Sequence, residues 1–81
     1  MNERIEAVVE YTDTFGGEAN YSWVRRKLIT LPADADGPAI RRAAKRAMRL
    51  TGIKGVWADY GDLLSFQPWG SETILYVSFV E

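Results

Sequence analysis

The chain of 81 residues contains no cysteine and no histidine. Without cysteine it can form no disulfide framework, no thiolate metal site and no cysteine nucleophile, and this composition fits a reducing cytoplasm. Without histidine it lacks the usual general base at neutral pH, the most common metal ligand and the middle member of a Ser-His-Asp triad. We therefore expect a protein that is not an enzyme, with no catalytic residue, no metal and no cofactor.

Long apolar runs are also missing. No window approaches the roughly 20 apolar residues that cross a bilayer, and the first residues lack the basic start and apolar run of a secretory signal. We expect a cytoplasmic protein that makes no contact with a membrane. With 47% hydrophobic residues the chain is too apolar to be disordered, and its length suits a single small domain over residues 1–81.

Acidic and basic side chains are separated along the sequence, although the net charge is only −1. Residues 1–24 carry five acidic and one basic side chain, and residues 25–54 carry nine basic and two acidic ones. Residues 55–81 carry four acidic side chains and no basic one. Whether this separation persists in space depends on the fold.

The first third of the chain has the pattern of a β-hairpin. Apolar and polar residues alternate over residues 3–12, and residues 21–31 are rich in β-branched and aromatic side chains, as strands are. Between them "TFGGEAN" supplies a turn, because Gly16 and Gly17 can take positive φ and Asn20 tolerates the left-handed region. We predict an antiparallel hairpin with a loop longer than the two to five residues that are usual.

The second strand does not alternate cleanly, because Arg25 and Lys27 interrupt its apolar face. Two interpretations account for this interruption. Either a bulge lies near Arg25 to Lys27, or the sheet carries apolar side chains on both faces.

The stretch "LPADADGPAIRRAAKRAMRLTG" predicts an amphipathic helix. Pro38 suits the first helical position, Asp36 or Gly37 suits the N-cap, and Gly52 suits the C-terminal stop. At about 100° per residue an alanine-rich apolar arc can lie close against a sheet. The opposite arc is basic and consists of Arg41, Arg42, Lys45, Arg46 and Arg49.

Three short strand-like runs follow the helix: "KGVWADY", "DLLSFQP" and "TILYVSFV". Turn signals separate them at Gly61 and at Pro68 to Glu72. The order ββαβββ predicts an α+β fold with two layers, in which one amphipathic helix packs on one face of an antiparallel four- to five-stranded sheet. Five of the large aromatic side chains are then expected in the core: Trp23, Trp57, Phe66, Tyr76 and Phe79. One helix cannot cover both faces of the sheet, so some Trp, Tyr or Phe side chains must be exposed unless a second copy covers them.

Two sets of charged side chains are candidates for binding a partner. The basic helix arc lacks acidic partners four residues away, and phosphate or an acidic protein would relieve its repulsion. The alternative is a solvated face whose long side chains cover apolar surface. The second set would form a negative patch that imitates phosphate, provided that the loops gather at one edge of the sheet. Its acidic members are Asp13, Glu18, Asp59, Asp62 and Glu72, and the alternative is that these are ordinary loop residues. Trp69, which lies in a turn between Pro68 and Gly70, is expected to be exposed and to dock on the partner together with them.

The stretch "YTDTFGGEANYSWVRR", Tyr11 to Arg26, resembles a motif of small proteins encoded by bacteriophages and prophages. Together with the short length, the basic central helix and the strand-rich "GDLLSFQPWGSETILYVSFV", it makes the chain similar to phage-borne anti-CRISPR proteins of type I systems, such as type I-C inhibitors. This resemblance implies a non-catalytic inhibitor in a bacterial host cell. Such an inhibitor binds a Cas protein, for example the Cas8-like subunit or the whole Cascade complex, and blocks binding of target DNA.

Three functional hypotheses follow. The leading one is an anti-CRISPR inhibitor, a monomer or weak homodimer, that docks its loop carboxylates and Trp69 on a basic Cas surface. The alternative is a small nucleic-acid-binding phage regulator that uses the basic helix arc. A third is a subunit of a larger phage assembly.

Overall fold

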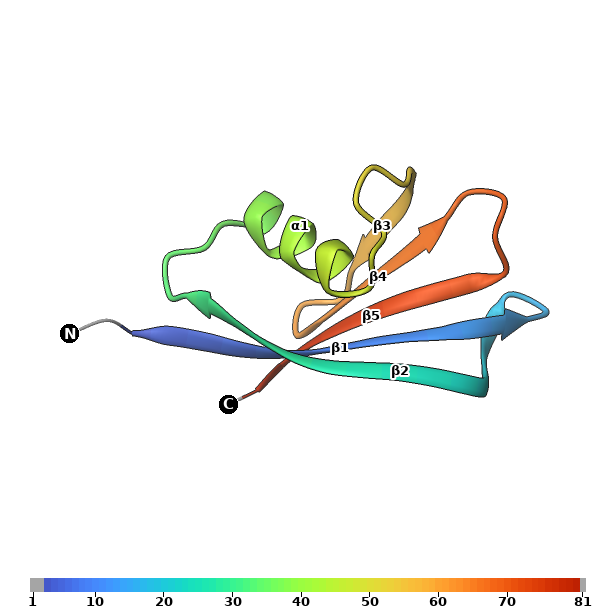
Figure 1. The fold of residues 1–81 in the computed structure, drawn as a ribbon, viewed down its shortest axis with the longest axis horizontal. Coiled ribbons are helices and arrows are strands. Elements are labelled where there is room, and N and C mark those ends of the chain that lie inside the picture. Colours follow the sequence, from blue (N-terminus) through green and yellow to red (C-terminus); the bar gives the residue numbers. More distant parts are fainter. Residues whose placement is uncertain (1–2, 81) are drawn as a thin grey trace.

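A computed structural model describes residues 3–80 and shows a five-stranded sheet with one helix packed on it (Figure 1). The strands are all antiparallel and stand in the order β2-β1-β5-β4-β3. The predicted α+β fold is therefore confirmed, with five strands. The elements are β1 (Arg4–Phe15), β2 (Glu18–Pro32), α1 (Gly37–Ala47), β3 (Gly55–Asp59), β4 (Leu63–Pro68) and β5 (Thr73–Val80).

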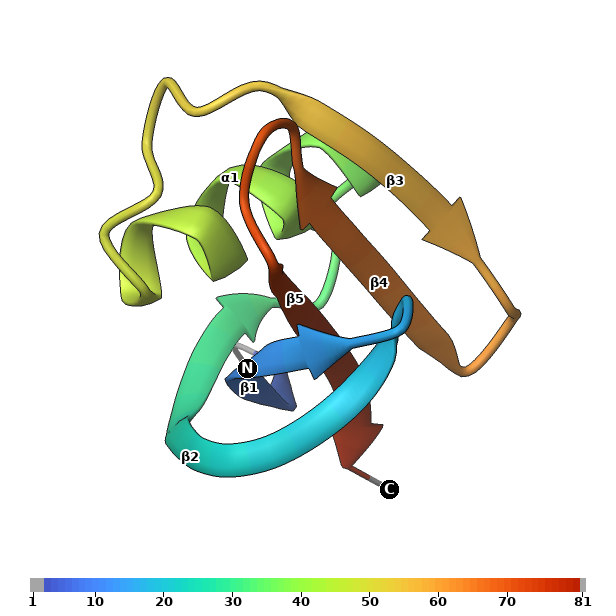
Figure 2. The same cartoon turned by 90° about the vertical axis from the view of Figure 1, so that its right-hand side faces the viewer.

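The core lies between α1 and the central strands β1 and β5. Ala7 and Val9 of β1 and Leu75 and Val77 of β5 are fully buried on the face beneath the helix. From the helix, buried Ala44 and Met48 contact this layer, and the small alanine lets the helix lie close to the sheet. Figure 2 shows α1 on one side of the twisted sheet, between the edge strands β2 and β3.

The helix begins where the sequence predicts and ends earlier. Asp36 is the N-cap, and its carboxylate accepts a hydrogen bond from the backbone N–H of Ala39 at 2.9 Å. The helix ends at Ala47 rather than near Gly52, because Arg49 takes the left-handed conformation at φ 59°. The backbone N–H groups of Arg49 and Leu50 then donate to the last free carbonyls, which is a Schellman motif with arginine in place of glycine.

The predicted long loop of the first hairpin is wrong. Strand pairing continues to Phe15 opposite Glu18, so only Gly16 and Gly17 form the loop. Their φ angles of 63° and 86° are both positive, as a two-residue type I′ turn requires. The strands are therefore longer than the sequence pattern indicates, because polar residues on both sides of the glycines remain extended.

The irregularity of this hairpin lies nearer to the turn than Arg25. Pairing is regular from Arg4 opposite Pro32 to Thr12 opposite Val24, so no bulge occurs near Arg25 to Lys27. Instead, Asp13 alone stands opposite the residues from Asn20 to Trp23, which include Tyr21 at φ 56°. Of the two interpretations, the sheet with apolar side chains on both faces is the one observed.

The sheet face opposite α1 has no covering layer within residues 3–80, as one helix in the chain predicts. Large apolar side chains are exposed on it, among them Leu28 with 57% of its surface exposed. The others on this face are Val24, Val56, Tyr60 and Val80. This uncovered face is accordingly mixed in character, with the Glu10–Arg26 ion pair at its middle.

Candidate functional site

The structure does not bring the six predicted loop residues together. Thr14 N–H donates to the carbonyl of Glu72 at 2.8 Å, so the β1–β2 turn and the β4–β5 turn lie at the same end of the sheet. This end carries Asp13, Glu18, Trp69 and Glu72. The β3–β4 turn lies at the other end, where Leu63 pairs with Ser78, because successive turns of antiparallel strands alternate between ends. It carries Asp59 and Asp62, so the acidic set is divided in two.

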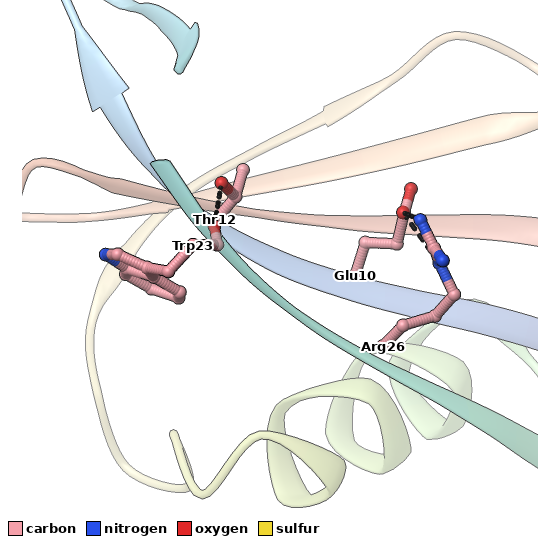
Figure 3. A network of polar contacts seen from close by, with 4 residues as sticks. All are labelled: Glu10, Thr12, Trp23 and Arg26. Atoms are coloured by element: carbon pink, nitrogen blue, oxygen red, sulfur yellow. Dashed lines mark hydrogen bonds and ion pairs between the residues drawn. The ribbon is translucent and has the colours of Figure 1, made fainter. Parts of the chain in front are cut away.

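Asp13 organises the bulge in β2. Its carboxylate accepts hydrogen bonds from the side-chain amide of Asn20 at 2.9 Å, from the backbone N–H of Ser22 at 3.0 Å and from the Ser22 hydroxyl. The hydrogen bonds from Asn20 and Ser22 lower the pKa of Asp13 to about 2. Next to it, the hydroxyl of Thr12 donates to the carbonyl of Trp23 at 2.6 Å (Figure 3). Asp13 is thus bound within the chain, and sequence analysis missed this role because the bulge was not foreseen.

The basic helix arc is divided by its contacts. The Arg41 guanidinium carbon lies 5.8 Å from the centroid of the Trp57 ring, and Lys45 Nζ lies 4.9 Å from the centroid of Phe66. Lys45 Nζ also donates to the carbonyl of Ile53. These two side chains cover the aromatic edge of the core, as snorkelling cations do. The remaining three cations of the arc, Arg42, Arg46 and Arg49, are exposed.

Strand β2 adds two cations to the helix side of the sheet. Arg25 pairs with Tyr11 and Lys27 with Val9, and these β1 residues contact or belong to the core beneath α1. Paired residues of neighbouring strands share a face, so Arg25 and Lys27 face the helix side as well. The sequence pattern indicates only that they interrupt an apolar face.

These side chains meet at a groove between β2 and the end of α1. A hollow of about 440 Å³ is lined by Arg25, Arg26, Lys27 and Arg49 and by the apolar Ala47 and Met48. The guanidinium of Arg26, however, is turned to the other side of the hairpin, where it pairs with Glu10. A second hollow of about 330 Å³ continues from Lys27 to Arg46. We call this surface the basic groove and define it by its four cations: Arg25, Lys27, Arg46 and Arg49.

The cations of the basic groove have no acidic partner within 4.0 Å among residues 3–80. In that part of the chain the one ion pair joins Arg26 to Glu10, with a hydrogen bond from Arg26 Nε at 2.9 Å. Figure 3 shows this pair on the side of the hairpin away from α1, whereas Trp23 points to the opposite side. The basic groove therefore carries uncompensated positive charge.

A third hollow, of about 520 Å³, lies on the uncovered face between the tip of the first hairpin and strands β3 and β4. Tyr60, Tyr76 and Ile74 line part of it. Burial raises the pKa of Tyr76, and the neighbouring Tyr21, Tyr60 and Glu10 add to this shift. A tyrosine whose pKa is raised above its ordinary value stays neutral at physiological pH, so Tyr76 does not act as a general base there.

The described part of the chain offers neither a metal centre nor a membrane-spanning helix. Residues 3–80 contain no group of three or more Asp, Glu, His or Cys side chains placed to hold a metal ion. No helix among them has the length and apolar character needed to span a membrane. Comparison with protein-family models, with curated proteins and with solved structures yields no match for the chain.

Proposed function

We propose that this protein binds nucleic acid through the phosphate backbone and that the basic groove is the binding surface. The observation that carries the proposal is the convergence of four cations, from β2, from α1 and from the turn that closes α1, without an acidic partner among residues 3–80. Like charges that face one another destabilise a fold slightly. Phosphates relieve that repulsion, and their bound counterions are released on contact.

Three of the acidic side chains lie outside the basic groove. Glu10 is paired with Arg26 on the other side of the hairpin, and Asp59 and Asp62 flank the turn of the β3–β4 hairpin. Exposed charges separated by more than about 10 Å are largely screened at 0.1 M salt. A net charge near zero is therefore compatible with a locally basic binding surface.

The test is a titration of fluorescein-labelled 20-nucleotide DNA, single-stranded and duplex, over a series of salt concentrations. Four phosphate contacts predict a slope of about −3 for the logarithm of the binding constant against the logarithm of the salt concentration. Arg25→Gln and Arg49→Gln should each weaken binding and reduce the slope by about 0.7–0.9. No binding to either DNA at low salt would refute the proposal.

Arg26→Gln is the matched control. It removes the same charge from the neighbouring position of the same strand, but on the other side of the hairpin, where Arg26 binds Glu10. Binding should stay within about twofold of the unmodified protein. If Arg26→Gln and Arg25→Gln weakened binding equally, or if polyglutamate bound as tightly as DNA, general charge or an acidic protein partner would explain the result instead.

A second candidate function is the anti-CRISPR inhibitor that the sequence resemblance implies. The observation that favours it is a pair of exposed aromatic side chains at the end of the sheet, Phe15 with 80% and Trp69 with 67% of the surface exposed. They lie at the same end as Glu18 and Glu72. Exposed aromatics rimmed by carboxylates suit a protein partner with an apolar socket and a basic rim, such as a Cas subunit that binds DNA.

The test of this second function is co-elution with a purified type I-C Cascade complex, together with CRISPR interference in cells. Trp69→Ala and Phe15→Ala should abolish both co-elution and inhibition. Tyr60→Ala, an exposed aromatic at the opposite end of the sheet, should leave both unchanged. If the unmodified protein neither co-elutes nor inhibits interference, this function is excluded.

A further inference from the structure

We infer that the basic groove takes single-stranded nucleic acid and that one unpaired base stacks on Trp23. This inference rests on the proposed nucleic-acid binding and adds the class of ligand and the residue that selects it. The sequence pattern assigns Trp23 to the core, but 41% of its surface is exposed. The reason is its position near the start of β2, where the bulge interrupts the strand.

Trp23 extends the basic groove along β2. Trp23, Arg25 and Lys27 occupy every second position of β2 and lie on the side of the sheet that faces the helix. The Arg25 guanidinium carbon lies 5.9 Å from the centroid of the Trp23 ring. An aromatic ring next to a row of cations is the arrangement that binds single strands, in which the cations follow the backbone and the ring stacks on a base.

The indole is held in place by neighbouring groups. The ring of Tyr11 lies edge-on to it, with the ring centroids 5.4 Å apart and the planes at 65°. The Trp23 carbonyl accepts the hydrogen bond from Thr12, which fixes the backbone (Figure 3). A ring that is already ordered loses little conformational freedom when a ligand binds.

Arg25 can leave the indole without losing an acidic partner. Its guanidinium has no ion pair among residues 3–80, and its contact with the Trp23 ring, at 5.9 Å from the centroid, is a cation–π contact of the kind that is weak at an exposed site. When it turns to a phosphate, the indole face is free for a base. The bases of a duplex are stacked on one another, so only an unpaired base offers its face to a protein. The carboxylate of Asp13, bound to Asn20 and Ser22, limits the positive surface beyond Trp23.

The experiment compares three labelled probes: a 20-nucleotide oligothymidylate, a 20-base-pair DNA duplex, and heparin as a polyanion without bases. The unmodified protein should bind the oligothymidylate at least tenfold more tightly than the duplex. Trp23→Ala should weaken oligothymidylate binding about tenfold and leave heparin binding within twofold. Trp69→Ala removes an exposed tryptophan outside the basic groove, and it should change neither.

Two further variants separate stacking from folding. Trp23→Phe keeps an aromatic ring and should bind the oligothymidylate within about threefold of the unmodified protein, whereas Trp23→Leu keeps apolar volume and should behave like Trp23→Ala. Tryptophan fluorescence of the Trp69→Phe protein should be quenched by the oligothymidylate, and the quenching should disappear in the Trp23→Phe, Trp69→Phe double variant.

The failures of the two proposals are distinguishable. If none of the three probes binds at low salt, nucleic-acid binding itself fails, and the inference fails with it. If heparin and duplex bind as tightly as the oligothymidylate, or if Trp23→Ala and Trp23→Leu bind the oligothymidylate normally, only the stacking inference is overturned. Equal losses for heparin and oligothymidylate in Trp23→Leu would likewise overturn it.

Discussion

Asp13 combines a surface position with four hydrogen bonds to its carboxylate, and those from Asn20 and Ser22 give it a measurable signature in pH titrations. The bonds from Asn20 and Ser22 lower its pKa from 3.8 to about 2. A carboxyl whose pKa is lower in the folded state contributes its full stabilisation above pH 3.8 and loses it as the pH falls towards 2.

We therefore predict that Asp13→Asn reduces the pH dependence of the melting temperature between pH 4 and 2, because the substituted residue does not titrate. Thermal unfolding followed by circular dichroism measures this. Ser22→Ala should instead shift the dependence to higher pH, because a hydroxyl donor is removed while the carboxyl remains. An unchanged profile in both variants would show that Asp13 does not support the bulge.

Arg49 takes a backbone conformation that favours glycine, and it also belongs to the basic groove. At φ 59° it closes the helix in the position that glycine usually occupies. The left-handed region costs a residue with a Cβ about 1–2 kcal/mol. A glycine at this position would avoid that cost, but the larger entropy of its unfolded state would offset part of the gain in stability. Arginine at this position therefore lowers stability while it supplies a cation to the basic groove.

Arg49→Gly should accordingly raise the free energy of unfolding by about 0.5–1 kcal/mol and weaken DNA binding. Arg49→Gln should weaken DNA binding to the same degree without that gain in stability, because the strained conformation stays. Urea denaturation and the salt-dependent DNA titration together measure both effects. A loss of stability in Arg49→Gly would contradict the assignment of the Schellman motif.

At the scale of the elements, the contact between β3 and β4 depends on a glycine. A Cβ added to Gly55 would stand 2.2 Å from the backbone carbonyl oxygen of Gln67, and that backbone cannot move aside cheaply. Gly55→Ala should therefore lower the free energy of unfolding by about 1–3 kcal/mol, as overpacking does. Gly37→Ala is the control, because its Cβ would meet only the Arg41 side chain at 3.8 Å. Urea denaturation of both variants measures this difference, and an equal change in the free energy of unfolding would exclude a close approach at Gly55.

At the scale of the whole molecule, the two faces of the sheet differ in what they contribute to stability. Phe66 beneath α1 is 1% exposed, whereas Leu28 on the uncovered face is 57% exposed. Phe66→Ala should cost about 3–5 kcal/mol, and Leu28→Thr should change the free energy of unfolding by less than about 0.5 kcal/mol. Chemical denaturation at several protein concentrations measures both. A concentration-dependent loss in Leu28→Thr would show instead that a second copy covers this face.

The sequence alone determined the elements and their order. The apolar periodicity of residues 3–12 and of the helix, the cap at Asp36 and the glycines of the first turn are local signals, because each depends on residues a few positions apart. Because these local signals predict a single helix, and one helix covers only one face of a sheet, the uncovered second face could be predicted as well. The bulge at Asn20 to Trp23 and the end of the helix at Ala47 were not predicted. The bulge depends on hydrogen bonds to Asp13 of the neighbouring strand, and the helix ends where Arg49 takes a backbone conformation that usually belongs to glycine.

Only the tertiary structure decided which charges stand together. Side chains of a strand alternate between two faces, and nothing near Arg25 and Lys27 in the sequence indicates which face the helix covers. The pairing of β1 with β5 and the alternation of turns between the two ends of the sheet separated Asp59 and Asp62 from Asp13. The same pairings placed β2 beside the end of α1, where residues from two parts of the chain form the basic groove. Such groupings depend on contacts between residues distant in sequence, and for that reason composition and spacing could not predict them.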